Sequence, residues 1–210
     1  MKNFQIVVLS SEQDIEQEIE ILHQLFERGL GYYHLRKPHK NYQEHCDFLQ
    51  RIDSKYHARI VPHFYHELLQ EFMLKGIHFQ EQKREEVFGD GNTIEQYLAS
   101  LQSINKDITL STSFHAPEEL NSCPILFDYQ FLSPVFSSIS KEGYEGKGFD
   151  VGYIQKTIIG MGGATSKNIT DFMRLGYQGV GVLGGIWNSK RPVEEYEAIV
   201  EACRGAKSKV

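Results

Sequence analysis

Short apolar runs alternate with amphipathic stretches along the whole chain, and this alternation constrains the fold more than any other feature. Eight runs have the length and composition of buried strands: residues 5–9, 32–35, 59–61, 76–79, 108–111, 129–132, 158–161 and 179–183. Most of the segments between them have helical spacing: residues 15–26, 42–56, 67–74, 94–104, 117–120, 166–175 and 192–204. Because strands that alternate with helices form parallel sheets, the pattern predicts an α/β protein.

The number of repeats favours a closed architecture over an open sheet. Eight strand–helix repeats are typical of a (β/α)8 TIM barrel, and 210 residues suit a single domain spanning 1–210. A doubly wound sheet is the alternative, and a glycine-rich turn after the first strand would favour it. That turn reads Leu9-Ser10-Ser11-Glu12 and has no glycine. We expect residues 205–210 to form a frayed tail.

Charge and cysteine content argue against several classes of partner. The formal net charge is -6, with 22 Lys and Arg against 28 Asp and Glu, which argues against a nucleic acid or a membrane as the main partner. Cys46, Cys123 and Cys203 have no paired spacing, which suits a reducing compartment better than a disulfide framework. The first apolar run is too short for a signal peptide or a membrane span. We therefore expect a cytoplasmic protein with a small-molecule ligand.

Two glycine pairs follow the last two predicted strands. Gly162-Gly163 comes after the seventh strand and Gly184-Gly185 after the eighth, and a helical pattern begins beyond each pair. Glycines let backbone N–H groups approach a ligand closely, and a helix start adds free N–H groups and a positive dipole. The turns after strands seven and eight are the usual phosphate site of such barrels. We expect the four glycines to bind a phosphate; the alternative is that they only ease tight turns.

Polar side chains also stand at the ends of other strands. His34 and Arg36 lie on the same side of the second strand, and Arg36 can hold a phosphate or carboxylate; the alternative is a surface arginine beside a turn. His115 follows the fifth strand, where a histidine can act as acid or base; the alternative is a structural or exposed histidine. The long loop after the sixth strand carries Lys141 and clustered serines, which suit a polyanion or a lid; the alternative is an ordinary exposed loop.

Histidines at or near the strand ends raise the possibility of a metal centre. They are His34, His63, His66, His78 and His115. Barrel hydrolases gather such histidines around zinc. However, the first strand has no His-x-His pair, and no Asp closes the eighth strand. We therefore expect no bound metal.

Several short motifs follow one another in a characteristic order. They are the strand ending at Arg36, Gly76-Ile77-His78-Phe79, Ser113-Phe114-His115, the segment from Asp128-Tyr129 to Ser133-Pro134-Val135-Phe136 with Ser138, Ser140 and Lys141 after it, and the two glycine turns. Their order and spacing together resemble the thiamine phosphate synthase/TenI family of (β/α)8 barrels, over nearly the whole chain. The resemblance implies an enzyme of thiamine biosynthesis that acts on a phosphorylated thiazole, and it suggests a homodimer.

The resemblance implies one of two activities. The synthase joins a pyrimidine diphosphate to a thiazole phosphate and releases pyrophosphate, and it holds Mg²⁺ through an Asn-Asp pair after strand three and an Asp after strand four. Here those positions read Pro62-His63-Phe64 and Gln80-Glu81-Gln82-Lys83, so Glu81 is the only nearby carboxylate. Mg²⁺ prefers hard oxygen ligands, which Pro, His and Phe do not supply.

The TenI-like tautomerase branch dispenses with that magnesium site. It binds a thiazole carboxylate phosphate and moves a proton so that the ring becomes aromatic, and its S-x-H histidine matches His115. We expect His115 to shuttle the proton, Arg36 or Lys141 to face the carboxylate, and no cofactor to take part unless the synthase activity brings Mg²⁺. Further substrate contacts are expected from His34, His63, His78, Ser113, Ser138 and Ser140.

Two other functions stay open. The chain is compatible with a thiamine phosphate synthase, and also with a non-catalytic protein that only binds a thiazole or thiamine phosphate. The sequence does not decide whether His63, His66 and Glu81 rebuild a pocket for the pyrimidine diphosphate or for a metal.

Overall fold

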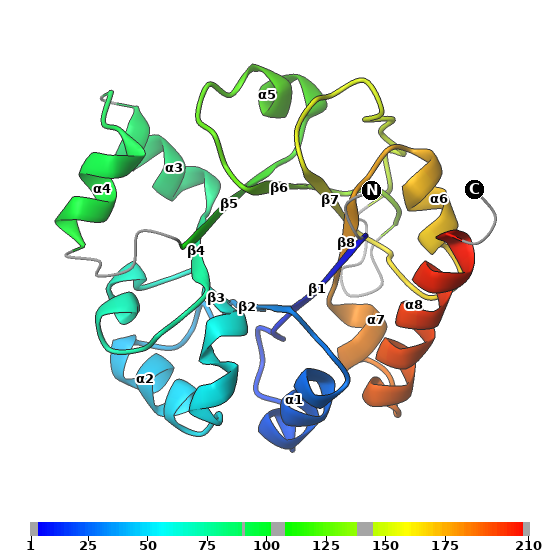
Figure 1. Ribbon diagram of the computed structural model, residues 1–210, viewed down its shortest axis with the longest axis horizontal. Coiled ribbons are helices and arrows are strands. Elements are labelled where there is room, and N and C mark those ends of the chain that lie inside the picture. The colour runs from blue at the N-terminus through cyan, green and yellow to red at the C-terminus, as the bar shows by residue number, and fades with distance from the viewer. Residues whose placement is uncertain (1–3, 90, 102–107, 138–144, 208–210) are drawn as a thin grey trace.

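The computed structural model describes residues 4–89, 91–101, 108–137 and 145–207, and it has the predicted (β/α)8 barrel fold (Figure 1). The parallel strands are β1 (Gln5–Leu9), β2 (Tyr32–Leu35), β3 (Ile60–Pro62), β4 (Gly76–Phe79), β5 (Thr109–Phe114), β6 (Tyr129–Leu132), β7 (Ile158–Met161) and β8 (Gly179–Val182). The helices around them are α1 (Glu18–Glu27), α2 (Tyr42–Gln50), α3 (Glu81–Phe88), α4 (Ile94–Ser100), α5 (Pro117–Ser122), α6 (Ile169–Arg174), α7 (Gly184–Trp187) and α8 (Pro192–Lys207). Two 3-10 helices, η1 (Ser54–Arg59) and η2 (His66–Gln70), flank β3.

The barrel is nearly closed, with one seam. The hydrogen-bonded strand order is β3-β2-β1-β8-β7-β6-β5-β4, so no ladder joins β3 to β4 among the described strands. These two strands nevertheless lie side by side (Figure 1). Just before β4, the N–H of Lys75 donates to the carbonyl of Ile60 at 2.9 Å. Beyond the strands, Gln80 Nε2 donates to the carbonyl of His63 at 3.0 Å. We call this line the β3–β4 seam.

Some predicted helices are shorter than their sequence patterns indicated. The pattern over 42–56 divides into α2 and η1, because the His57 ring lies 3.0 Å from the carbonyl of Leu49 and 3.2 Å from that of Ile52, where α2 ends. Only η2 forms within the pattern over 67–74. Helix α3 was not predicted, since Val87 is its only buried residue and the segment has no apolar stripe.

Two chain segments are longer than predicted. Strand β5 continues to Phe114, which pairs with Leu132 of β6, so Ser113 lies within the strand and not in the turn after it. Helix α8 continues to Lys207, and Ala206 is buried. Residues 205–207, which were expected in the frayed tail, belong to this helix, while residues 208–210 lie outside the described part of the chain.

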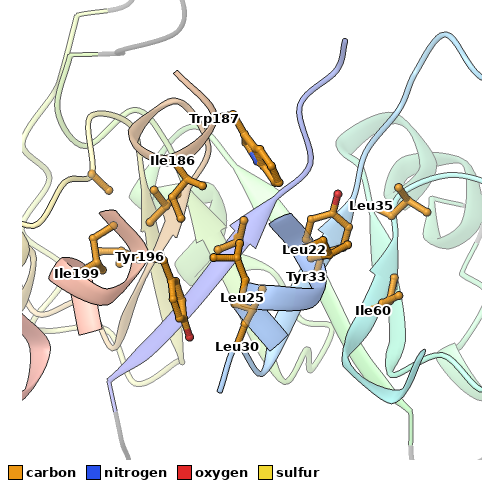
Figure 2. Packing of buried hydrophobic residues seen from close by; sticks show 14 of the residues in the cluster. Leu22, Leu25, Leu30, Tyr33, Leu35, Ile60, Ile186, Trp187, Tyr196 and Ile199 are labelled. Carbon is orange, nitrogen blue, oxygen red and sulfur yellow. The ribbon is translucent and has the colours of Figure 1, made fainter. Parts of the chain in front are cut away.

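The apolar core has two parts: an outer shell between the helices and the strands, and an inner plug of side chains inside the barrel. In the outer shell, helix side chains such as Leu22, Leu25 and Ile199 are buried against the strands (Figure 2). Trp187 on α7 is also buried there, and its Nε1 donates to the carbonyl of Leu9 at 2.6 Å. Inside the barrel, a smaller cluster consists of Val7, Tyr129, Phe131 and Ile159, with Tyr32 and Met161 packed against it. This inner plug supports the residues at the carboxyl ends of the strands.

A fully buried ion pair connects the end of β2 to α1. Lys37 Nζ lies 2.6 Å from Glu18 Oε2, and the two side chains are 0% and 4% exposed. Lys37 Nζ also donates to the carbonyl of Gln13 at 3.0 Å, and Tyr33 donates its hydroxyl to Glu18 Oε1 at 3.2 Å. Burial raises the pKa of the Glu18 carboxyl above its usual value, and its contacts with Lys37 and Tyr33 oppose that shift. Lys37 therefore bonds to the α1 side of the barrel.

Candidate active site

A cavity of about 420 Å³ opens among residues at the carboxyl ends of the strands. Ten residues singled out in the sequence line it: Arg36, His63, His78, Glu81, Ser113, His115, Gly162, Gly163, Gly184 and Gly185. The lining also includes residues to which the sequence assigned no role: Leu9, Glu12, Gln80, Phe131, Ser133 and Met161. Barrel enzymes carry their active sites at this end of the strands, so the cavity is the candidate active site.

The two glycine turns lie together at the cavity, and close packing requires three of their four glycines: Gly162, Gly163 and Gly185. Gly162 and Gly163 have φ angles of 105° and 65°, in the region that favours glycine. A Cβ at Gly163 would lie 2.6 Å from the carbonyl oxygen of Ser137, and a Cβ at Gly185 would lie 2.6 Å from that of Ala164. The structural explanation therefore holds for these three glycines, and it is compatible with a second role in ligand binding.

Side-chain hydrogen bonds fix the shape of the turn after β7. Asn168 Oδ1 accepts from the N–H of Thr165 at 2.9 Å, and its Nδ2 donates to the carbonyl of Gly163 at 2.8 Å. Beside this turn, α7 begins at Gly184, and the first N–H groups of a helix have no acceptor within the helix. The two turns thus present backbone groups in a fixed arrangement at the cavity wall.

His115 is oriented by the chain segment after β6. Its Nδ1 lies 3.1 Å from the carbonyl oxygen of Ser133 and 3.3 Å from the hydroxyl of the same residue. A carbonyl only accepts hydrogen bonds, so this contact assigns the proton of the neutral ring to Nδ1 and leaves Nε2 as an acceptor. His115 is exposed and lines the cavity. The ring is therefore placed to take a proton from a bound ligand and to return it.

Arg36 lines the cavity as predicted, but it already has an anionic partner. Its Nη1 forms an ion pair with Glu12 Oε1, and both side chains are about one-third exposed, at 29% and 33%. The N–H of Arg36 donates to Ser10 Oγ at 2.7 Å, which connects the ends of β1 and β2. A phosphate or carboxylate in the cavity would therefore compete with Glu12 for the guanidinium group.

We predict that Glu12→Gln tightens the binding of inorganic phosphate about tenfold, because it removes the competing charge from Arg36. Arg36→Gln should weaken the same binding by at least about tenfold. Isothermal titration calorimetry at low salt measures both dissociation constants. Glu81→Gln is the matched control: it removes a second carboxylate from the cavity lining and should have a smaller effect than Glu12→Gln. Equal effects at the two positions would show that only net charge matters.

Three buried histidines lie together beneath the cavity, and we call them the histidine trio: His34, His63 and His78. His34 Nδ1 lies 2.9 Å from His63 Nε2, and His34 Nε2 lies 2.5 Å from the Tyr129 hydroxyl. The rings of His63 and His78 stack with centroids 3.9 Å apart. His63 and His78 line the cavity, whereas His34 is fully buried and does not. The expected substrate contact of His34 therefore needs correction, because its side chain is enclosed by the rest of the cluster.

Burial keeps these histidines neutral. It lowers the pKa of His34 to about 3, and it lowers the pKa values of His63 and His78 well below the usual value. His66 lies next to the cluster: its Nε2 donates to the carbonyl of His78 at 3.0 Å, and burial lowers its pKa to about 4. None of the four is therefore placed to carry a positive charge at neutral pH.

The donor set at the cavity does not fit the Mg²⁺ of the synthase activity. Glu12 and Glu81 are the carboxylates among the lining residues, and Glu12 is paired with Arg36. Among the described residues, the only group of three or more potential ligands with converging atoms is the histidine trio. Mg²⁺ requires oxygen ligands in near-octahedral geometry, which imidazole rings do not provide. No catalytic step through Mg²⁺ follows from this arrangement.

Three predicted site residues lie outside the described part of the chain: Ser138, Ser140 and Lys141. Their roles remain predictions. None of the described helices combines the length and the hydropathy that a membrane span requires.

Fold and cavity together define a (β/α)8 barrel of the type that carries its site at the carboxyl ends of the strands. No family model matches the chain, and no curated protein matches it. Solved structures do match. A thiamine phosphate pyrophosphorylase from Bacteroides thetaiotaomicron is 25% identical, with a TM-score of 0.65 over 97% of this chain and 96% of the other. This match confirms the resemblance to the thiamine phosphate synthase/TenI family and supports an enzyme of the transferase type.

Two further matches have lower sequence identity and show similarity of fold only. A thiamine phosphate pyrophosphorylase from Pyrococcus furiosus is 13% identical, with a TM-score of 0.74 over 97% of this chain and 96% of the other. A (S)-3-O-geranylgeranylglyceryl phosphate synthase from Thermoplasma acidophilum, in complex with its substrate sn-glycerol-1-phosphate, is also 13% identical, with a TM-score of 0.65 over 97% and 94% of the two chains. The barrel is thus shared with enzymes of different reactions.

Proposed function

We propose that this barrel binds a thiazole carboxylate phosphate and moves a proton on it, as TenI-like tautomerases do. The observation that carries the proposal is the contrast between the two sides of the cavity. One side has His115 with an acceptor nitrogen and the two glycine turns. The other side has neutral, buried histidines where the synthase activity would need oxygen ligands for Mg²⁺.

In this proposal, each part of the cavity has a separate task. The glycine turns anchor the phosphate through backbone N–H groups, and Arg36 leaves Glu12 to face the carboxylate. His115 Nε2 takes a proton from the thiazole and returns it at a different position, so the ring becomes aromatic and the composition of the substrate is unchanged. Ser133 holds the ring of His115 in place throughout.

Thiamine phosphate synthase activity is the second candidate. The 25% identity to a thiamine phosphate pyrophosphorylase over nearly the full length of both chains favours it. It would need a way of binding the pyrimidine diphosphate without the oxygen ligands that Mg²⁺ prefers. Product analysis distinguishes the two candidates, because only the synthase consumes the pyrimidine diphosphate and releases pyrophosphate.

The test is one incubation series with both thiazole tautomers, with and without the pyrimidine diphosphate and Mg²⁺. We expect interconversion of the tautomers in every condition and no thiamine phosphate. His115→Ala should lower the rate of interconversion by about 10²–10⁴-fold, the usual contribution of a general acid–base group, with little change in the affinity for thiazole phosphate. His39→Ala is the control, because His39 is exposed and is not one of the cavity-lining residues.

Two results would count against the proposal. Formation of thiamine phosphate with Mg²⁺ present would make the synthase the first choice. Thermal stabilisation by thiazole phosphate without turnover of any substrate would instead indicate a binding protein.

A further inference from the structure

The histidine trio has the composition of a metal site that neither family activity uses. One nitrogen from each ring converges, with all three atoms within 4.8 Å of one another. In a tetrahedral site with Zn–N bonds of about 2.0–2.1 Å, neighbouring nitrogens lie about 3.3 Å apart. The closest pair, His34 Nδ1 and His63 Nε2, is 2.9 Å apart. Small rotations of the rings, with nitrogen displacements of about 0.5–1.5 Å, would bring the three nitrogens to that spacing.

The contacts of His78 leave one of its nitrogens free for a metal. Its Nδ1 lies 3.0 Å from Ser111 Oγ, and Ser111 in turn donates to the carbonyl of Ile77 at 3.4 Å. Ser111 Oγ can accept from His78 Nδ1–H while its own proton is donated elsewhere. In that tautomer the lone pair of His78 is on Nε2. Metal-bound histidines usually have this arrangement, with the second nitrogen donating to a fixed acceptor.

His34 is supported in the same way by a second hydroxyl group. Its Nε2 lies 2.5 Å from the Tyr129 hydroxyl, which can accept from Nε2–H and leave the lone pair on Nδ1. That nitrogen is the one that faces His63. Two of the three rings are thus held by hydroxyl groups behind them, one on β5 and one on β6.

The His63 ring faces His34 through its Nε2. Its Nδ1 is buried and has no hydrogen-bond partner among the described residues. His63 and His78 both line the cavity, which gives a cation a path from solvent.

We propose that the histidine trio binds one divalent transition-metal ion, with Zn²⁺ as the preferred ion. Imidazole nitrogens suit Zn²⁺ and its neighbours in the first transition row, whereas Mg²⁺ and Ca²⁺ need oxygen. Three protein ligands leave a fourth position, which water or an atom of the cavity's ligand would take. This site replaces the expectation of no bound metal, and it is independent of which phosphate the cavity binds.

Cobalt titration tests the site directly. Full-length protein without a histidine tag is treated with a chelator, desalted and titrated with Co²⁺, which reports its coordination through visible absorption bands. We expect saturation at one Co²⁺ per chain, bands of the intensity of a four-coordinate ion, and displacement by Zn²⁺. X-ray absorption of the Zn²⁺ complex should then count three imidazole ligands, and this measurement needs no variant.

Metal binding by substituted variants tests whether the ion binds at the histidine trio. His63→Gln and His78→Gln should each weaken binding by at least about 100-fold, and Tyr129→Phe by about 10–100-fold, as for other outer-shell partners. His57→Gln is the matched control, a buried histidine whose ring bonds to carbonyls at the end of α2, and it should bind as the parent does. Absence of saturable binding in the folded parent protein, unchanged binding in folded His63→Gln, or fewer than three imidazole ligands would overturn the proposal.

Discussion

Through the histidine trio alone, lowering the pH from 7 to 5 is expected to remove about 6 kcal/mol from the free energy of unfolding of the metal-free protein. The cause is the histidine trio, whose rings stay neutral in the folded state while the unfolded chain takes up protons below a pKa of about 6.5. Each group loses about 1.4 kcal/mol per pH unit in that range, or about 2 kcal/mol at pH 5. The total is comparable to the whole stability of a typical domain.

The direction of this effect follows from the sign of the shifts. A folded-state pKa below the unfolded value means that the unfolded state binds more protons, so stability rises with pH. The contribution is fully present above about pH 6.5 and is lost as the pH falls toward the folded pKa, which for His34 is about 3. Urea unfolding at several pH values, with a chelator in the buffer, measures the slope.

Matched variants assign this slope to the trio. His63→Gln should reduce the dependence of the unfolding free energy on pH by about 1.4 kcal/mol per unit between pH 6 and 5. His39→Gln should leave it unchanged, because His39 is exposed. An identical slope in parent and His63→Gln would mean that other groups control the acid transition.

Lys37→Met is expected to lower the free energy of unfolding by about 3–5 kcal/mol, the usual cost of leaving one member of a buried ion pair without its partner. Lys37 Nζ is 2.6 Å from Glu18 Oε2, and neither charge has appreciable contact with water. The side chain of Met fills a similar volume, so the loss comes mainly from the unpaired Glu18 carboxylate. Chemical denaturation at pH 7 gives the value directly.

A double variant and a surface control make this result specific. Glu18→Gln combined with Lys37→Met removes both charges, keeps an acceptor for Tyr33, and should recover more than half of the loss. Lys40→Ala breaks the neighbouring pair with Asp14, whose side chain is 72% exposed, and should cost less than about 1 kcal/mol. Similar losses at Lys37 and Lys40 would show that the buried pair has no special role.

The sequence predicts the frame of this barrel well because each strand is a local apolar run. Seven of the eight predicted strands lie within one residue of the observed bounds at both ends, and β5 is the exception, since its last residues are Ser113 and Phe114. Serine is a weak strand signal, and the extension depends on pairing with β6. The short helices are harder to predict, because α3 buries only Val87 and α7 has four residues.

The site is only partly predictable for a different reason. Strand ends indicate which residues reach the mouth of the barrel, and most of the expected residues do line the cavity. Contacts between strands are not visible in the sequence. The pairing of Arg36 with Glu12, and the approach of His34 to Tyr129 across the barrel, both depend on how β1, β2 and β6 are placed around the ring. Lys37 adjoins Arg36 in sequence but bonds to α1.

The β3–β4 seam has a consequence for how ligands and folding are connected. Seven neighbouring strand pairs are held by continuous ladders, so local opening of the ring costs least along the one remaining line. His63 and His78 stack across that line, and both form part of the cavity. A ligand that touches both rings therefore binds only the closed ring. Raising the concentration of such a ligand therefore stabilises the closed ring by mass action. Amide hydrogen exchange is then expected to slow at β3 and β4 before it slows elsewhere in the barrel.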